Sequence, residues 1–474
     1  MLPNQTQYNV SKQRNKEIDV IIQLLNTDFQ IVDELSGSTT TDGISFNIDG
    51  SADIRRNCTL SLYVKDKTFE VDEGGKIWLN KYVQVIVREK DQLTDIFVPT
   101  NMGIYVVTNP SQTYNATTHT LTLNLLDLVC KLNGYISGNL KGLDYLIKKG
   151  ENVREAIIAI LDLNNITKYS VVDINEDVPT DISVDATSNY WALLIQLRDI
   201  LPNYQMYFEV DGTFIFEPIP YKTEETPIAT DDALYDKIIS WSKTSQFDQV
   251  KNSVTVIGKT HEVKYFDGEG ILADFVLHLN INEVSTLYDG LMVGFVLSDQ
   301  SQEGEVAVIK PNSSLGAFVV LDEGRYVRLQ KGKYYVMIYD ETEGAFFSLG
   351  EITAKYTSKD ENPDSPYSIQ VVGEERNITL SGGIYDNIWS ENLAKQHSDW
   401  ELYRRTNLQE SVSIEIVPTF WLNNANKIIE ISLPNVNHEE QLPTQYVINS
   451  TTITYGTTAT QTINVTKYYP FYNN

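Results

Sequence analysis

The sequence predicts a mainly β fold that contains two antiparallel β-barrel domains, a small α+β module and an inserted β-sandwich. Three observations carry this prediction. Runs in which apolar and polar residues alternate with period two fill both ends of the chain, as in strands that bury one face. Helical periodicity is confined to 151–164, to the stretch from Ser188 to Leu201, and to 390–405. Residues 262–360 hold long alternating runs and almost no helical pattern.

The first barrel is predicted over residues 1–135. Residues 17–35 indicate two strands joined at Asn26-Thr27-Asp28. In 42–64, apolar residues alternate on both sides of the turn Asp49-Gly50-Ser51, which predicts paired strands with one buried face. These apolar residues are Ile44, Phe46, Ile48, Cys58, Leu60, Leu62 and Val64. Further alternating runs at 83–87, 102–109 and 119–129 complete the barrel.

A charged stretch, Asp53-Ile54-Arg55-Arg56-Asn57, interrupts the pattern between the two strands of 42–64. A run of exposed charge is usually a solvated loop. A doubled arginine also offers planar, many-donor groups to the carboxylates of a neighbouring subunit. Two interpretations therefore stand side by side: a solvated loop, and an intersubunit contact through Arg55 and Arg56.

Residues 136–235 are predicted to form the α+β module. A helix at 151–164 carries its apolar residues on one stripe. A second helix is capped by Ser188 or Asn189 and ends before Pro202. Asp211-Gly212 then predicts a hairpin turn between aromatic strands. The aromatic residues of this module are predicted as core rather than as a ligand site.

The second barrel is predicted to start at 236–261 and to resume over 361–474, with the β-sandwich of 262–360 inserted between these parts. Its helix at 390–405 has Ser390 as candidate N-cap. His397 shares a helical stripe with Leu393 and Trp400. We predict a buried core histidine there rather than a ligand.

Composition narrows the function classes. The 474 residues suggest about three domains. With Lys+Arg 37 and Asp+Glu 64, the net charge of −27 argues against a basic nucleic-acid footprint. Cys58 and Cys130 both lie in apolar strand patterns and are predicted as buried residues rather than a disulfide or metal pair. No signal peptide and no apolar run long enough to span a bilayer is visible, so the chain is expected to be made as a soluble protein.

We find no catalytic, cofactor or metal pattern in the sequence. The histidines lack the spacing of a zinc helix, and no Cys-x-x-Cys pair exists. Gly74-Gly75-Lys76 lacks the other residues of a phosphate loop. The acidic clusters Asp267-Gly268-Glu269 and Asp360-Glu361-Asn362 could hold a calcium ion, but neither follows the pattern of an EF-hand loop. No cofactor is predicted, and the chain is not expected to be an enzyme.

Several stretches, taken in order, resemble the baseplate hub proteins of tailed bacteriophages, a family that includes the hub-like N-terminal part of tail-associated lysins and hubs of phage-tail-like bacteriocins. The stretches are SGSTTTDGISFNIDGSADIRRNCTLSLYV (36–64), FVPTNMGIYVVTNP (97–110), HTLTLNLLDLVCKL (119–132), the module at 151–218, residues 365–406, and VSIEIVPTFWLNNANKIIEI (412–431). The resemblance covers most of the chain apart from 262–360. Where the family usually has Asp before Asn, this chain has Trp421-Leu422-Asn423-Asn424-Ala425-Asn426, which we interpret as drift at a turn.

The resemblance implies a homotrimer in which two tube-like barrels per chain build a ring of six similar units in the virion tail. Such a ring would join the six-fold tail tube or distal tail protein above to a three-fold spike, tip or fibre protein below. DNA would pass through without specific binding, and an acidic lumen would keep it from sticking. In this setting Arg55 and Arg56 become candidate contacts between subunits.

Two alternatives come from other function classes. Residues 262–360 would serve as a receptor- or carbohydrate-binding domain if exposed aromatic residues such as Tyr265, Phe266 or Tyr288 stack on sugars. Structural widening of the hub is the simpler interpretation of this insert. A peptidoglycan hydrolase hub is the second alternative, although the sequence ends within barrel-like strands.

Overall fold

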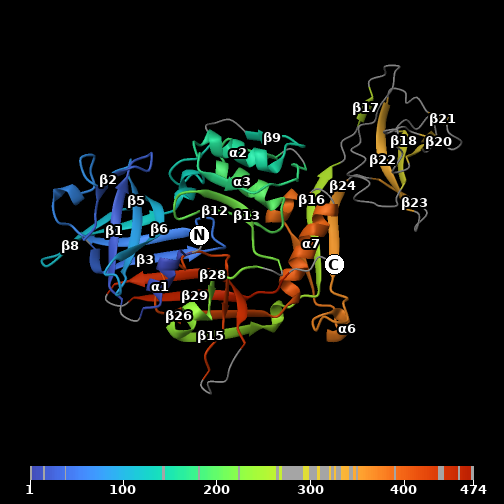
Figure 1. The fold of residues 1–474 in the computed structure, drawn as a ribbon. Helices are drawn as coiled ribbons and strands as arrows, with labels where there is room; N and C mark the ends of the chain where they lie inside the picture. Colours follow the sequence, from blue (N-terminus) through green and yellow to red (C-terminus); the bar gives the residue numbers. More distant parts are fainter. Residues whose placement is uncertain are drawn as a thin grey trace. The chain divides into compact units, whose positions relative to one another are not determined.

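The structure, a computed structural model, divides into two compact units, and each is described by itself (Figure 1). Unit 1 comprises Met1–Val250 and Asn407–Asn474, and unit 2 comprises Lys251–Thr406. The described residues are 3–13, 16–37, 39–140, 145–179, 182–222, 225–262, 266–268, 292–297, 307–309, 320–321, 325–326, 332–340, 345–348, 351–388, 391–435, 442–456 and 459–470.

Unit 1 is built mainly from strands. Its N-terminal elements are α1 (Gln5–Ser11), β1 (Ile18–Leu25), β2 (Ile31–Glu34), β3 (Thr39–Asp49), β4 (Arg56–Tyr63), β5 (Tyr82–Lys90), β6 (Phe97–Val107), β7 (Ser111–Tyr114) and β8 (His119–Leu126). Then come β9 (Tyr145–Ile147), α2 (Val153–Leu163), β10 (Tyr169–Val171), β11 (Ile182–Val184), α3 (Tyr190–Asp199), β12 (Tyr204–Phe208), β13 (Phe214–Pro218), β14 (Ala229–Thr230), α4 (Asp231–Leu234) and β15 (Ile238–Gln246). The C-terminal strands are β26 (Gln409–Ile416), β27 (Ile428–Ile431), β28 (Thr444–Tyr455) and β29 (Thr460–Lys467). The mainly β fold class predicted from the sequence is confirmed.

One sheet joins the two ends of the chain. Its strands follow the order β15-β26-β29-β28-β3-β4-β8-β6-β5-β1-β2. The predicted pairing within 42–64 is confirmed, because β3 and β4 are antiparallel with Phe46 opposite Cys58. The other edge of β3 pairs with β28, where Ile453 lies opposite Phe46. In Figure 1 the blue N-terminal strands and the red C-terminal strands accordingly lie side by side.

The sheet covers two separate hydrophobic cores. The first core is formed mainly by β1, β3, β4, β5 and β8, and includes the predicted apolar residues Phe46, Cys58 and Leu60. Phe420, Ala425 and Ile453 from the C-terminal segment complete it. The second core is formed by residues of β26–β29 together with the segment 229–234. Each barrel-like half therefore has its own core, but the first depends on residues from the end of the chain.

The α+β module follows its predicted pattern closely. Asn189 caps α3 by accepting a hydrogen bond from the backbone N of Ala192 at 2.9 Å, and α3 ends at Asp199, before Pro202. Strands β12 and β13 form an antiparallel hairpin. Gly212 in its turn has φ +81°, a left-handed conformation that glycine adopts without strain.

Both cysteines are buried, as predicted. Cys58 is 1% exposed and Cys130 is fully buried, and neither forms a disulfide. Burial raises the pKa of the Cys130 thiol to about 12. Both thiols are therefore protonated at neutral pH and unreactive as nucleophiles.

Unit 2 contains two sheets and the longest described helix. Its elements are β16 (Ser253–Glu262), β17 (Phe266–Gly268), β18 (Met292–Leu297), β19 (Ala307–Ile309), β20 (Val320–Leu321), β21 (Arg325–Tyr326), β22 (Gly332–Asp340), β23 (Ala345–Ser348), β24 (Glu351–Lys359), α6 (Ile369–Val372), β25 (Asn377–Ser381) and α7 (Glu391–Thr406). Strands β24, β16 and β25 form one sheet, and β17–β23 form the other. The predicted domain boundaries, including the insert 262–360, stay predictions.

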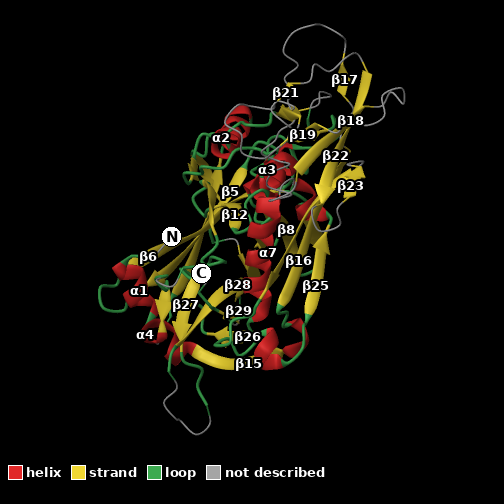
Figure 2. Ribbon diagram, turned by 90° about the vertical axis from the view of Figure 1, so that its right-hand side faces the viewer, coloured by secondary structure: helices red, strands yellow, loops and turns green. Residues whose placement is uncertain are grey.

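Helix α7 lies along β16 and β24 (Figure 2). His397 is 3% exposed and its ring makes an edge contact with Tyr385. With Leu393 and Trp400 also buried, the prediction of a core histidine is confirmed. The predicted N-cap, Ser390, lies outside the described residues, as do Tyr265 and Tyr288.

Candidate functional site: a buried arginine junction and an uncharged sheet face

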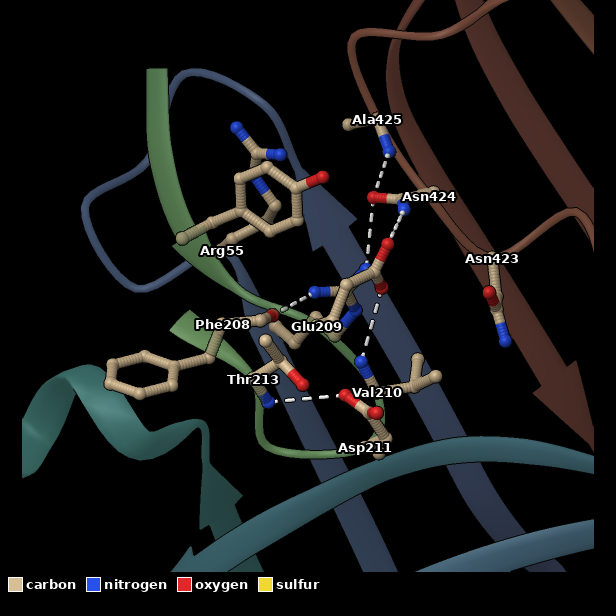
Figure 3. Close-up of polar contacts among 12 residues, drawn as sticks. Arg55, Phe208, Glu209, Val210, Asp211, Thr213, Asn423, Asn424 and Ala425 are labelled. Carbon is tan, nitrogen blue, oxygen red and sulfur yellow. Dashed lines mark hydrogen bonds and ion pairs between the residues drawn. The ribbon is translucent and has the colours of Figure 1, made fainter. Parts of the chain in front are cut away.

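Arg55 and Arg56 lie inside unit 1, where β4 begins. Their exposed fractions are 2% and 1%, so the solvated-loop interpretation is wrong for both arginines. The backbone N of Arg56 donates to Oδ2 of Asp127 at 3.0 Å, which fixes the start of β4. Both side chains extend to the hairpin β12–β13 of the α+β module, and Figure 3 shows Arg55 beside this hairpin.

The two guanidinium groups use different partners on that hairpin. Arg55 donates to Oε1 of Gln205 at 2.7 Å and stacks on the ring of Tyr207, 3.8 Å from the ring centre. Arg56 donates to the backbone O of Phe208 and forms an ion pair with Glu209, Nη2 to Oε2, at 3.4 Å. Such stacking and forked donation suit arginine and not lysine.

A third segment meets the same arginines from the C-terminal part of unit 1. Asn424 accepts from Nη2 of Arg56 at 2.9 Å and donates to Oε1 of Glu209 at 2.9 Å. Asn426 donates to Oε1 of Gln205 at 2.8 Å. We call the set Arg55, Arg56, Gln205, Glu209 and Asn424 the arginine junction. It ties β4, the module hairpin and the 421–426 segment together.

The asparagines of the 421–426 segment explain a sequence feature that we interpreted as drift. In Trp421-Leu422-Asn423-Asn424-Ala425-Asn426, each asparagine side chain has a specific partner, and Asn423 donates to the backbone O of Asn101 at 2.9 Å. Asn426 has φ 55°, a left-handed conformation that asparagine tolerates better than most residues. The concentration of asparagines was the signal in the sequence, but it does not reveal their distant partners.

Burial and charge oppose each other in the junction. Burial lowers the pKa of Arg55 to about 10, so the group stays protonated at neutral pH. Burial acts to raise the pKa of Glu209, but the charge of Arg56 contributes to a net lowering. Burial raises the pKa of Asp127 to about 6, against hydrogen bonds from the backbone N of Arg56 and Val129. Within the described residues, Nε and Nη1 of Arg55 and Nε of Arg56 have no hydrogen-bond partner.

The junction has a structural role within one chain. Its ion pair and hydrogen bonds join three segments that are distant in sequence, and breaking a buried ion pair from one side destabilises a fold. The predicted role of Arg55 and Arg56 as contacts between subunits stays a prediction.

A second feature is the sheet face that points away from the two cores. It runs over β15, β26, β29, β28, β3, β4 and β8 to β7, which pairs with the outer edge of β8. The paired residues on this face are Ser240, Ser242, Thr244, Gln246, Gln409, Ser411, Ser413, Glu415, Thr460, Thr462, Asn464, Thr466, Val447, Ser450, Thr452, Thr454, Ser45, Asn47, Asp49, Asn57, Thr59, Ser61, Tyr63, Thr120, Thr122, Asn124, Leu126, Ser111 and Thr113. We call this surface the hydroxyl face.

The hydroxyl face is almost free of charge. Asp49 and Glu415 are its charged side chains among these paired residues, although 21% of the chain is charged. Its side chains bond to one another across strands. Oγ1 of Thr452 donates to Oδ1 of Asn47 at 3.1 Å, and Nδ2 of Asn464 donates to Oγ of Ser450 at 3.0 Å.

The described residues offer no catalytic or metal arrangement. Among them, no group of at least three His, Cys, Asp or Glu side chains is placed to hold a metal ion. The carboxylate of Asp360 instead organises a turn, accepting from the backbone N of Asn362 at 3.1 Å and from Oγ of Ser365 at 2.6 Å. The other acidic cluster, 267–269, lies outside the residues whose side chains are described. No described helix is long and apolar enough to cross a membrane.

Comparisons with solved structures find folds similar to that of this chain. The tail protein from Neisseria meningitidis MC58 is similar with a TM-score of 0.50 and 10% identity, over 95% of this chain and 96% of that chain. The prophage MuSo2 43 kDa tail protein from Shewanella oneidensis gives a TM-score of 0.49 and 10% identity, over 95% and 98% of the two chains. At this identity, the first likeness concerns the fold alone.

A further solved structure and one family model also match this chain. The E. coli c3393 protein, a component of the type VI secretion system, gives a TM-score of 0.41 and 7% identity, over 98% of this chain and 78% of that chain. Residues 364–472 match a family described as a domain of unknown function, DUF5048. No curated protein matches the sequence.

Proposed function

We propose that this chain is a structural hub subunit of a phage tail or phage-tail-like particle, without enzymatic activity. Three copies would form a ring that joins a six-fold tail tube or distal tail protein to a three-fold spike, tip or fibre. The chain would then be a virion component of the tail baseplate. The fold it shares with a tail protein supports a structural role in a tail.

One observation carries the proposal furthest: a single sheet passes through two barrel-like halves, each with its own core. Three such chains around an axis present six similar halves in alternation. In a ring of this kind, three-fold symmetry relates the three chains, and approximate six-fold symmetry relates the six halves. That is the geometry that a joint between six-fold and three-fold parts requires.

The ring is tested by imaging the purified oligomer. We expect particle averages of a closed ring with three-fold symmetry, and a mass of three chains by light scattering. A stable monomer, or a dimer with two-fold symmetry, would contradict the proposal.

The hydroxyl face is proposed as the lining of the ring, where DNA passes. The sequence suggested an acidic lumen, from the net charge of −27. The hydroxyl face supports a nearly uncharged lumen instead, since neutral hydroxyl and amide groups neither attract phosphates nor repel them strongly. Without lysine or arginine among its paired residues, this face has no groups that would hold DNA by releasing counterions.

Lysines on this face are expected to make the ring retain DNA. In the variant Thr59→Lys with Asn464→Lys, three copies would bring six new charges toward one axis. We expect the oligomer to bind duplex DNA at least about tenfold more tightly than the wild type, with an affinity that falls steeply as salt rises. Fluorescence anisotropy of labelled duplex DNA at several salt concentrations measures both effects.

The matched control adds the same charge elsewhere. Leu79 and Leu93 are 92% and 90% exposed and do not belong to the hydroxyl face, so Leu79→Lys with Leu93→Lys spreads its charges over other surface. We expect weak DNA binding and a shallow salt dependence for this control. Equal binding by the two variants would show that the hydroxyl face does not line the DNA path.

A further inference from the structure

We propose that neighbouring copies join edge to edge, with β7 of one copy paired to β15 of the next. This inference rests on the proposed ring and names the surfaces that would close it. The two strands end the same run of paired strands, from β15 through β28 and β3 to β8 and β7. A free strand edge presents unpaired backbone N–H and C=O groups that template pairing with another chain.

Strand β15 is an unusually open edge. Within the described part of the chain it pairs with β26 alone, and most of its side chains are exposed on both faces. Ile239 and Trp241 are 56% and 39% exposed. Soluble proteins usually protect a long edge with proline, several charges or a covering loop. β15 has no proline, and Lys243 is its charged residue.

Strand β7 is the matching open edge at the other end. Within the described residues it pairs with β8 alone, and its whole length is exposed. Tyr114 is 77% exposed, a large fraction for an aromatic side chain. Both ends of the run therefore leave apolar surface and backbone groups open.

Both edge strands contribute small polar side chains to the hydroxyl face and aromatic side chains to the opposite face. On β7, Ser111 and Thr113 belong to the hydroxyl face, as do Ser242 and Thr244 on β15. Pairing the strands would therefore continue the hydroxyl face from one copy to the next without a break. On the opposite face, Tyr114 of one copy would lie on the same side as Trp241 of its neighbour, and aromatic pairs across strands are stabilising.

The surfaces beside the two edges carry opposite charge. Next to β15, Lys243 and Lys467 share one carboxylate, that of Glu410, at 2.9 and 3.7 Å. Next to β7, Gln112 donates to the backbone O of Phe69 at 3.3 Å, which places the segment 66–73 beside this edge. That segment has four exposed acids and one exposed lysine, and Lys65 and Lys76 flank it, which leaves a small excess of negative charge; the residues are Asp66, Glu70, Asp72, Glu73 and Lys67. Opposite charge favours contact between unlike edges and disfavours contact between two like edges.

The contact is head to tail. Because β7 and β15 are different surfaces, pairing them cannot make a closed two-fold dimer. It produces a ring when the rotation between copies closes and a filament when it does not. A closed ring of three copies would leave no β7 or β15 edge free.

A pair of cysteines tests the contact. The variant carries Thr113→Cys on β7 and Thr244→Cys on β15, and the native Cys58 and Cys130 are buried and will not react. After treatment of the oligomer with a short bifunctional maleimide, we expect covalent dimers and trimers on a denaturing gel. On the same gel, each single-cysteine variant should run as a monomer. An oligomer assembled from a mixture of the two single-cysteine variants should give covalent dimers and no covalent trimers.

Control pairs separate the alternatives. The strand β2 ends the full sheet at its other side, and its Ile31 is 61% exposed. Ile31→Cys with Thr244→Cys should give no cross-link, nor should Leu93→Cys with Thr244→Cys. A three-fold ring without cross-linking between 113 and 244, or with efficient cross-linking between 31 and 244, would overturn the edge contact and leave the hub proposal standing. A wild-type chain that stays monomeric would overturn both.

Discussion

Replacing Arg56 with alanine is expected to lower the free energy of unfolding of unit 1 by about 3–5 kcal/mol, the usual effect of breaking a buried pair from one side. Arg56 is 1% exposed and is the partner that Glu209, Phe208 and Asn424 share. Without it, the Glu209 carboxylate loses the guanidinium that lies 3.4 Å from it, and the backbone O of Phe208 loses its donor. Urea unfolding followed by tryptophan fluorescence measures the change.

An exposed ion pair in the same sheet provides the control. Arg88 pairs with Asp19, with side chains 34% and 42% exposed, and Arg88→Ala should cost less than about 1 kcal/mol. The measurement also separates the two roles of the arginines. If Arg56→Ala unfolds like the wild type but no longer forms oligomers, the intersubunit role is correct and the junction described above is not a source of stability.

Replacing Phe420 with alanine is expected to destabilise the first core by about 3–5 kcal/mol, as for other fully buried phenylalanines. Phe420 is fully buried and belongs to the core that β3, β4 and β8 build, although it lies in the C-terminal part of the chain. Loss of its ring leaves a cavity that the surrounding strands cannot fill. Thermal unfolding followed by near-UV circular dichroism reports this loss of packing.

The matched comparison is Leu93→Ala, which removes a side chain that is 90% exposed. Its stability should change by less than about 0.5 kcal/mol. A change of less than about 1 kcal/mol for Phe420→Ala would mean that the first barrel is stable without its C-terminal contribution.

The local parts of the fold were predictable from the sequence, because they depend on neighbours along the chain. Alternation predicts the hairpin of β3 and β4, and Asn189 marks the start of α3. The same alternation predicts that Cys58 is buried. These features are set by periodicity and capping, which a window of a few residues reveals.

The arginine junction could not be predicted in this way. Arg55 donates a hydrogen bond to Gln205, 150 residues away in sequence, and Arg56 donates one to Asn424, 368 residues away. Viewed locally, two arginines beside Asp53 and Asn57 are a solvated loop, and only the packing of the β12–β13 hairpin and of the C-terminal segment against β4 brings their partners near. The burial of Arg55 and Arg56 is thus a consequence of topology, which composition and spacing do not encode.

The pairing of β28 with β3 also sets the order in which the protein matures during synthesis. Thr452 bonds to Asn47 across a separation of 405 residues, and contacts this distant form late because the intervening chain must first be ordered. While the ribosome is still making the second half, the edge of β3 is unpaired and the first core lacks Phe420 and Ile453. A truncated chain would therefore expose the unpaired edge of β3 and an incomplete core. We expect such products to be bound by chaperones or degraded rather than assembled into particles.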